Sequence, residues 1–167
     1  MGDAREQDRL DALEDRIRVL EDQATLYRLI ASWGPAADTA NGEAASSFWA
    51  DDSVLVAEGN RIDGAAGVRA MIDSEGQRVL VQQGCAHVQG LPVVQIHGDR
   101  AVAVNYGRVY LHTQDGYDIW RVSANCWEFT RTELGWRVLR RDAHVIDGGP
   151  EARDLLRRAT APTEAEG

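Results

Sequence analysis

Three short segments of the chain contain residue types that suit acid–base chemistry. Trp33 is followed five residues later by Asp38, His87 opens a His-Val-Gln-Gly segment, and a Ser-Ala-Asn segment contains Ser123 and Asn125. A neutral imidazole is the commonest general base near neutral pH, a carboxylate can orient it, and small polar groups can hold a substrate. Together the three segments predict a cofactor-free acid–base pocket.

The pair formed by Asp38 and His87 is central to this prediction. His87 has apolar neighbours and shares a strand face with Cys85, so it could also be a core histidine bonded to a backbone carbonyl. Asp38 lies in a segment poor in charge, where a buried carboxylate needs a partner. It could equally be a solvated turn residue or the cap of the next helix. Because Asp38 can orient an imidazole, we favour a catalytic His87.

Ser123 and Asn125 are two residues apart, and residues at that spacing share one face of a strand. Trp127 and Phe129 continue the same face, so hydrogen-bonding groups and aromatic rings alternate along it. This mixture is typical of the wall of a substrate pocket. The alternative is that the polar pair faces water, because antiparallel sheets often have one solvated side.

The preceding strand carries a second polar face, formed by Tyr106, Arg108, Tyr110 and His112. One of these tyrosines could donate a hydrogen bond to a substrate carbonyl. The alternative is that this face contacts solvent or another subunit.

The elements that would position these residues begin with a long N-terminal helix. Its apolar residues recur at spacings of three and four, which places them in one stripe: Leu10, Leu13, Ile17, Leu20, Ala24 and Tyr27. The stripe could contact another subunit or cover the chain's own domain, and we favour packing within the chain. Gly34-Pro35 predicts an interruption of this helix, and a short second helix is expected to end near Phe48-Trp49.

After the second helix the pattern changes to strands. Two short strands are expected around Glu58-Gly59-Asn60, then a helix over 65–74, then four long strands over 85–96, 101–112, 119–130 and 136–146. This order predicts an α+β fold in which helices close a strongly curved antiparallel or mixed sheet into a cone. Residues 1–150 would form one domain, and residues 151–167 a short helix and a polar tail.

Composition narrows the classes of function. The chain has 167 residues and a formal charge of −9, which argues against nucleic acid or an anionic membrane as partner. It shows no basic segment leading into an apolar run and no membrane-spanning stretch, so we expect a cytoplasmic protein. Two cysteines and no glycine-rich phosphate loop predict neither a disulfide framework, a zinc site nor a nucleotide cofactor.

On these residues the chain resembles the NTF2-like superfamily, in the SnoaL-like group that includes scytalone dehydratase and bile-acid 7α-dehydratase. Trp33 and Asp38 match a Trp and a catalytic Asp at the same spacing, and His87 matches the base histidine of a His-x-x-Gly segment. The Ser-Ala-Asn segment matches one whose Ser and Asn contact substrate, eleven residues before a Trp that corresponds to Trp136.

The resemblance implies a cone-shaped fold, no cofactor and no metal, a small hydrophobic substrate, and a homodimer or homotrimer. The chain also departs from these family members at two positions. Ala37 stands where scytalone dehydratase has a Tyr, and Trp33 stands where the bile-acid enzyme has a Tyr. His112 lies near the second catalytic histidine of scytalone dehydratase.

The resulting hypothesis is a lyase, either a dehydratase or a cyclase, acting on a small hydrophobic carbonyl compound. His87 would take a proton, Asp38 would orient it, and Asn125 and Ser123 would position the substrate. Substrate contacts would also come from Trp33, Tyr106, Tyr110, Trp127, Phe129 and His112. The alternatives are a ketosteroid-isomerase-like isomerase and a non-catalytic ligand-binding or assembly module. An epoxide hydrolase using Arg108 would lack its two carboxylates.

Overall fold

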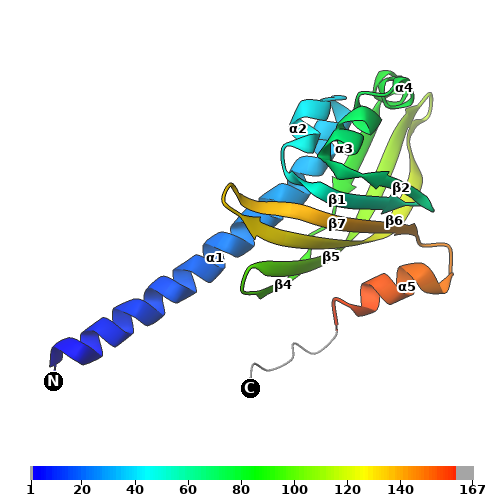
Figure 1. Ribbon diagram of the computed structural model, residues 1–167. Coiled ribbons are helices and arrows are strands. Elements are labelled where there is room, and N and C mark those ends of the chain that lie inside the picture. Colours follow the sequence, from blue (N-terminus) through cyan, green and yellow to red (C-terminus); the bar gives the residue numbers. More distant parts are fainter. Residues whose placement is uncertain (1, 161–167) are drawn as a thin grey trace.

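A computed structural model describes residues 2–160 and contains five helices and seven strands in that range (Figure 1). The helices are α1 (Gly2–Asp38), α2 (Gly42–Ser46), α3 (Gly64–Ile72), α4 (Glu75–Gln83) and α5 (Pro150–Arg157). The strands are β1 (Trp49–Ala57), β2 (Asn60–Asp63), β3 (Cys85–Gln89), β4 (Val93–His97), β5 (Arg100–Thr113), β6 (Gly116–Thr132) and β7 (Gly135–Val145).

All the strands belong to one sheet, in the order β2-β1-β7-β6-β5-β3, with β4 also paired to β5. The β1–β7 pair is parallel and the other pairs are antiparallel. The sheet is strongly curved, and α1, α2, α3 and α4 cover its concave side, while α5 lies against the opposite side (Figure 1). The expected α+β cone with a mixed sheet is confirmed, although hydrogen bonds do not close the sheet into a barrel.

The core lies between α1 and the concave face of the sheet. Leu26, Ile30 and Trp33 of α1 are buried there. Trp33 packs against Trp49 and Trp127, with ring centroids 5.8 and 6.3 Å away. Large aromatic side chains bury much apolar surface. This cluster therefore anchors the C-terminal half of α1 to the sheet.

The expected interruption at Gly34-Pro35 is wrong, because α1 continues through both residues to Asp38. A proline in a helix removes one hydrogen bond and crowds the preceding turn, and α1 ends three residues after Pro35, at Asp38. Gly34 serves a different purpose here. A Cβ at Gly34 would lie 2.1 Å from the His87 carbonyl oxygen, so only glycine lets α1 approach β3 this closely.

Two other details differ from the sequence-based expectation. The single strand expected over 85–96 is two strands, because Gly90, Leu91 and Pro92 separate β3 from β4. Helix α4 was not anticipated, although the sequence carries its N-terminal signal. Ser74 is the N-cap and accepts a hydrogen bond from the Gln77 backbone N–H, as in a capping box.

The two ends of the described chain differ from each other. Every residue from 5 to 21 is exposed, and this part of α1 projects beyond the sheet (Figure 1). The stripe expected to pack within the chain is therefore unpacked over this segment. Helix α5 corresponds to the short C-terminal helix, and the predicted polar tail lies mostly outside the described residues. No described helix has the length and apolar character that a membrane crossing requires.

Candidate active site

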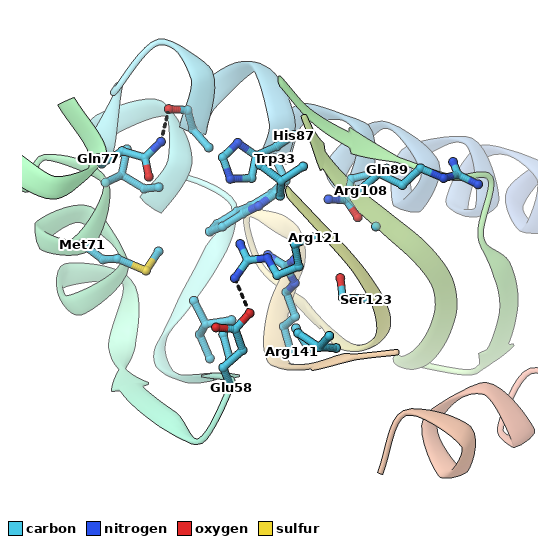
Figure 2. A pocket seen from close by; sticks show the side chains of 18 residues that line it. Trp33, Glu58, Met71, Gln77, His87, Gln89, Arg108, Arg121, Ser123 and Arg141 are labelled. Carbon is cyan, nitrogen blue, oxygen red and sulfur yellow. Dashed lines mark hydrogen bonds and ion pairs between the residues drawn. The ribbon is translucent and has the colours of Figure 1, made fainter. Parts of the chain in front are cut away.

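A cavity of about 150 Å³ lies between the helices and the concave face of the sheet. Figure 2 shows its polar side chains arriving from different elements: His87 from β3, Arg121 and Ser123 from β6, and Arg141 from β7. Most of the remaining lining is apolar and comes from Trp33, Ala37, Leu55, Ala57, Met71, Ile72, Val109, Ala143 and Val145. An apolar cavity with a few convergent polar groups is the usual form of a small-molecule site.

Asp38 and His87 form a close pair at one side of this cavity. The His87 Nδ1 lies 2.6 Å from Asp38 Oδ1, and the His87 backbone N–H donates to Asp38 Oδ2 at 2.8 Å. When Nδ1–H donates to the carboxylate, Nε2 of the neutral imidazole is left as a proton acceptor. The carboxylate therefore selects the tautomer that a general base needs.

The local structure explains how this pair is held. Asp38 is the last residue of α1, and both of its carboxylate oxygens bind one residue of β3. Burial raises the pKa of Asp38, but the hydrogen bonds from His87 outweigh it, so the pKa of this carboxyl lies below its usual range. Asp38 is thus ionised at neutral pH. The close approach at Gly34 holds the end of α1 against β3.

Arg141 is a charged side chain of the cavity that the sequence pattern does not reveal. It is only 7% exposed, and its guanidinium carbon lies 4.6 Å from the Trp33 ring centroid and 4.4 Å from that of Trp127. Its Nε and Nη2 donate to Asn125 Oδ1 at 3.3 and 2.9 Å. Two aromatic rings and one neutral amide therefore fix this cation at the wall of the cavity.

No carboxylate among the described side chains forms an ion pair with Arg141. Burial, together with the positive charge of Arg121, lowers the pKa of Arg141 to about 9. The side chain is still protonated at neutral pH. A buried cation with no counter-charge is costly, and an anion in the cavity would relieve that cost. Arg141 is accordingly the element of the site best suited to stabilise negative charge.

The other two arginines near the cavity are arranged differently. Arg121 forms an ion pair with Glu58, with 2.6 Å between Nη1 and Oε1, and both side chains are partly exposed at the rim. Figure 2 shows the guanidinium of Arg108 directed away from His87 and Arg141. Arg108 thus borders the cavity without presenting its charge to it.

The predicted Ser-Ala-Asn segment contributes in two ways. Ser123 lines the cavity. Asn125 is fully buried, and its amide nitrogen lies 3.5 Å from Ser123 Oγ. Its amide oxygen accepts a hydrogen bond from the Arg141 guanidinium. Gly107 faces this pair from β5, where a Cβ would lie 2.6 Å from the Asn125 amide nitrogen. Asn125 therefore positions Arg141, while Ser123 presents its hydroxyl to the cavity.

The structure places several other predicted substrate contacts outside the cavity lining. Trp127 and Phe129 are fully buried and stack on each other in the core beneath it. Tyr106 lies on the opposite side of the sheet, in a groove beside α5. Tyr110 and His112 follow a register shift after Val109 and do not line the cavity either. Only Trp33, His87 and Ser123 of the predicted residues line it, with Asp38 and Asn125 directly behind.

A strand irregularity explains why Arg141 escaped prediction. Simple alternation from Trp136 and Val138, both buried, would place Arg140 on the inner face. The β6–β7 register shifts between Glu128 and Phe129, so the two sides exchange and Arg141 points inward instead. Arg140 then pairs with Asp142 on the outer side.

Asp38, Cys85 and His87 also form a cluster whose ligand atoms lie within 4.8 Å of one another, which is close enough to share a metal ion. The Cys85 thiol donates to Asp38 Oδ1 at 3.4 Å. Burial, reinforced by the Asp38 carboxylate, raises the pKa of Cys85 to about 11. In this arrangement the protonated thiol serves as a hydrogen-bond donor to the Asp38 carboxylate.

Comparison with known proteins agrees with the geometry. The curved α+β sheet with a polar cluster in its lumen defines an NTF2-like protein. A family model described as a SnoaL-like domain matches residues 18–142. The chain therefore belongs to the SnoaL-like family of the NTF2-like superfamily. No curated protein matches the chain.

Solved structures resemble it over most of their length. An NTF2-like protein with a cystatin-like fold from Novosphingobium aromaticivorans is 39% identical, with a TM-score of 0.86 over 88% of this chain and 96% of its own. A Mycobacterium tuberculosis protein of unknown function is 20% identical, with a TM-score of 0.67 over 90% of each chain. The second similarity is one of fold alone.

Proposed function

We propose that this protein is a cofactor-independent lyase that dehydrates a small β-hydroxy carbonyl compound. The observation that carries the proposal is the 2.6 Å contact between His87 Nδ1 and Asp38 Oδ1, because it leaves Nε2 as a base on a cavity that also contains Arg141. The alternatives from the sequence, an isomerase and a binding module, would use the same cavity and are separated by the experiment below.

The reaction needs only proton transfer and bond cleavage. His87 Nε2 takes a proton from the carbon next to the carbonyl, and the C–H electron pair forms an enolate. The enolate then collapses to a conjugated double bond as the β C–O bond breaks. The leaving hydroxyl takes the proton from the His87 imidazolium and departs as water. The enzyme returns to its starting state, with Asp38 stabilising the imidazolium in between.

Arg141 supplies what the sequence lacked, since neither position expected to hold a tyrosine has one. A preorganised donor aimed at developing negative charge typically accounts for about 10²–10³ in rate. Arg141 can act in this way because its charge is fixed between two rings and is not cancelled by a carboxylate. In this proposal it stabilises the enolate oxygen, and Ser123 holds the substrate hydroxyl.

The size of the cavity limits the substrate. A dry cavity of comparable volume in another protein binds benzene, so about 150 Å³ corresponds to a single six-membered ring. The apolar lining favours the ring, and the polar groups favour one carbonyl and one hydroxyl. We therefore expect a single-ring β-hydroxy ketone rather than a polycyclic compound.

The test is dehydration of 3-hydroxycyclohexanone, followed by the ultraviolet absorbance of the conjugated enone. The wild-type chain should form the enone and the His87→Gln variant should lose roughly 10²–10⁴ of that rate, as for removal of a general base. Tyr117→Phe is a matched control, since Tyr117 is 69% exposed and does not line the cavity.

A second measurement separates the alternatives. In D₂O, exchange of the α-hydrogens of cyclohexanone reports proton abstraction without dehydration. His87-dependent exchange in D₂O, together with a product that has the same mass as its substrate when the reaction is run in H₂O, would identify an isomerase. If single-ring ketones bind to the protein but show neither α-hydrogen exchange nor product, the lyase proposal is overturned and the binding module is supported.

A further inference from the structure

The segment of α1 over residues 5–21, here called the arm, is long and unpartnered. It would extend for roughly 25 Å at the helical rise of 1.5 Å per residue. All of its residues are exposed, and four of them are large and apolar in the predicted stripe: Leu10 (49%), Leu13 (42%), Ile17 (54%) and Leu20 (63%). A monomer would leave this apolar stripe in water.

The stripe has the spacing of a coiled coil. Leu10, Ile17 and Ala24 are seven residues apart, and so are Leu13, Leu20 and Tyr27. They occupy the a and d positions of consecutive heptads, and we call these six residues the seam. In the central heptad Ile17 at a is followed by Leu20 at d, the combination that favours two strands. The strict period of seven favours a left-handed supercoil over a lone straight helix.

The seam also faces the right way. Leu26, Ile30, Trp33 and Ala37 form the stripe that α1 buries against its own sheet. At 100° per residue, the centre of this stripe lies about 140° around the helix from the centre of the seam. Two copies can therefore join along the seam with their domains on the outside of the pair.

Charge selects the partner and its direction. The g positions of the arm are Arg9 and Arg16, and the e positions are Glu14 and Glu21. In a parallel pair each g residue meets the next e residue of the other helix, so both contacts join Arg to Glu. An antiparallel pair would place like charges together. None of these four residues forms an ion pair among the described side chains.

We propose that the arm forms a parallel two-stranded coiled coil with the arm of a second copy of this chain. Three heptads would be marginal for free peptides, since an isolated helix must first be nucleated. Here the buried half of α1 nucleates the helix, so the arm enters the pair already ordered. The inference is independent of the proposed enzymatic activity.

The first experiment measures the mass of the full chain by analytical ultracentrifugation at tens of micromolar. The double variant Leu13→Asp/Ile17→Asp should halve the mass of the wild-type assembly. Val19→Asp is the matched control, because Val19 is 53% exposed on the same arm but lies outside the seam. Far-ultraviolet circular dichroism should show that both variants keep their folded domain. A monomeric wild type, or an unchanged mass in the double variant, would overturn the proposal.

The second experiment tests the direction. In a parallel pair, Leu13→Cys places the two introduced thiols beside each other, so mild oxidation should yield a covalent dimer. Val19→Cys and the wild type, whose Cys126 is buried and Cys85 half-buried, should not. Glu14→Arg/Glu21→Arg and Arg9→Glu/Arg16→Glu should each dissociate alone and associate when mixed. Failure of both the crosslink and the mixing would exclude the parallel pair.

Discussion

Arg131 and Arg141 both stack on tryptophan and yet have opposite electrostatic surroundings. Arg131 lies 4.4 Å from the centroid of Trp136, and its guanidinium binds Asp22 at 3.0 and 2.5 Å. Arg141 lies at the same distance from Trp127, but its acceptor among residues 2–160 is the neutral Asn125. Arg131 fixes α1 to the sheet, whereas Arg141 keeps its charge available to the cavity.

The pKa values express this difference. The Asp22 carboxylate raises the pKa of Arg131 above its ordinary value. Burial lowers the pKa of Arg141 to about 9. A stacked arginine that is paired with a carboxylate has a structural role. A stacked arginine without a carboxylate partner is a candidate binding group. Sequence alone cannot separate them, because both are Arg residues on neighbouring strands and their partners lie far away in the sequence.

Substitution by methionine should give the sharpest contrast. Arg141→Met should lower the rate of dehydration of 3-hydroxycyclohexanone by about 10²–10³, because it removes the donor for the enolate. Its free energy of unfolding in urea should be unchanged or higher, since an unpaired buried cation is lost. An Arg141→Met variant with wild-type turnover would remove Arg141 from the site.

Arg131→Met should show the reverse pattern. Within the described part of the chain it leaves the Asp22 carboxylate with one donor, the Trp136 indole N–H at 2.8 Å. The expected loss is about 1–3 kcal/mol in the free energy of unfolding, measured by urea denaturation, with turnover retained. Equal stability of the wild type and Arg131→Met would show that this contact has no structural role.

An added anion should distinguish the two sites without altering the covalent chemistry. Benzoate combines a single ring with a carboxylate, and at ten times its Kd it should stabilise the wild type by about 1.4 kcal/mol. This corresponds to a rise in Tm of about 3–6 °C in a thermal scan. Arg141→Met should abolish the shift and Arg131→Met should keep it. A shift that persists in Arg141→Met would place the anion elsewhere.

Lowering the pH should weaken the ion pair between Asp22 and Arg131, whereas the contact between Arg141 and the neutral Asn125 has no carboxylate to protonate. Hydrogen bonding by Arg131 outweighs burial and lowers the pKa of Asp22, with help from Trp136. A carboxyl whose folded pKa is depressed stabilises the fold above its unfolded pKa, near 3.8, and loses that contribution as the pH falls through the folded value. The difference in unfolding free energy between the wild type and Asp22→Asn should therefore shrink below about pH 4. A constant difference from pH 7 to pH 2 would contradict the shift.

The sequence predicted the parts of the molecule that depend on local pattern. The fold class followed from helices preceding long strands, and the proximity of Asp38 and His87 followed from a family-like spacing. The position of Arg141 depends on a register shift that alternation cannot reveal. The close approach of α1 to β3 depends on Gly34 fitting against the His87 carbonyl, a contact between segments far apart in the sequence. These two features therefore depend on contacts between distant segments, which a local sequence pattern does not show.

The amide of Asn125 has a consequence for the chemical durability of the site. Asparagine and aspartate have almost the same shape, so deamidation at this position would leave the packing intact and yet place a carboxylate against Arg141. The cation would then be neutralised from within, and the cavity would lose its attraction for an anion. Asn125 is fully buried within β6, where a rigid strand shields the amide from water. Burial of the Asn125 side chain thus slows its deamidation and preserves the positive charge of Arg141 in the cavity.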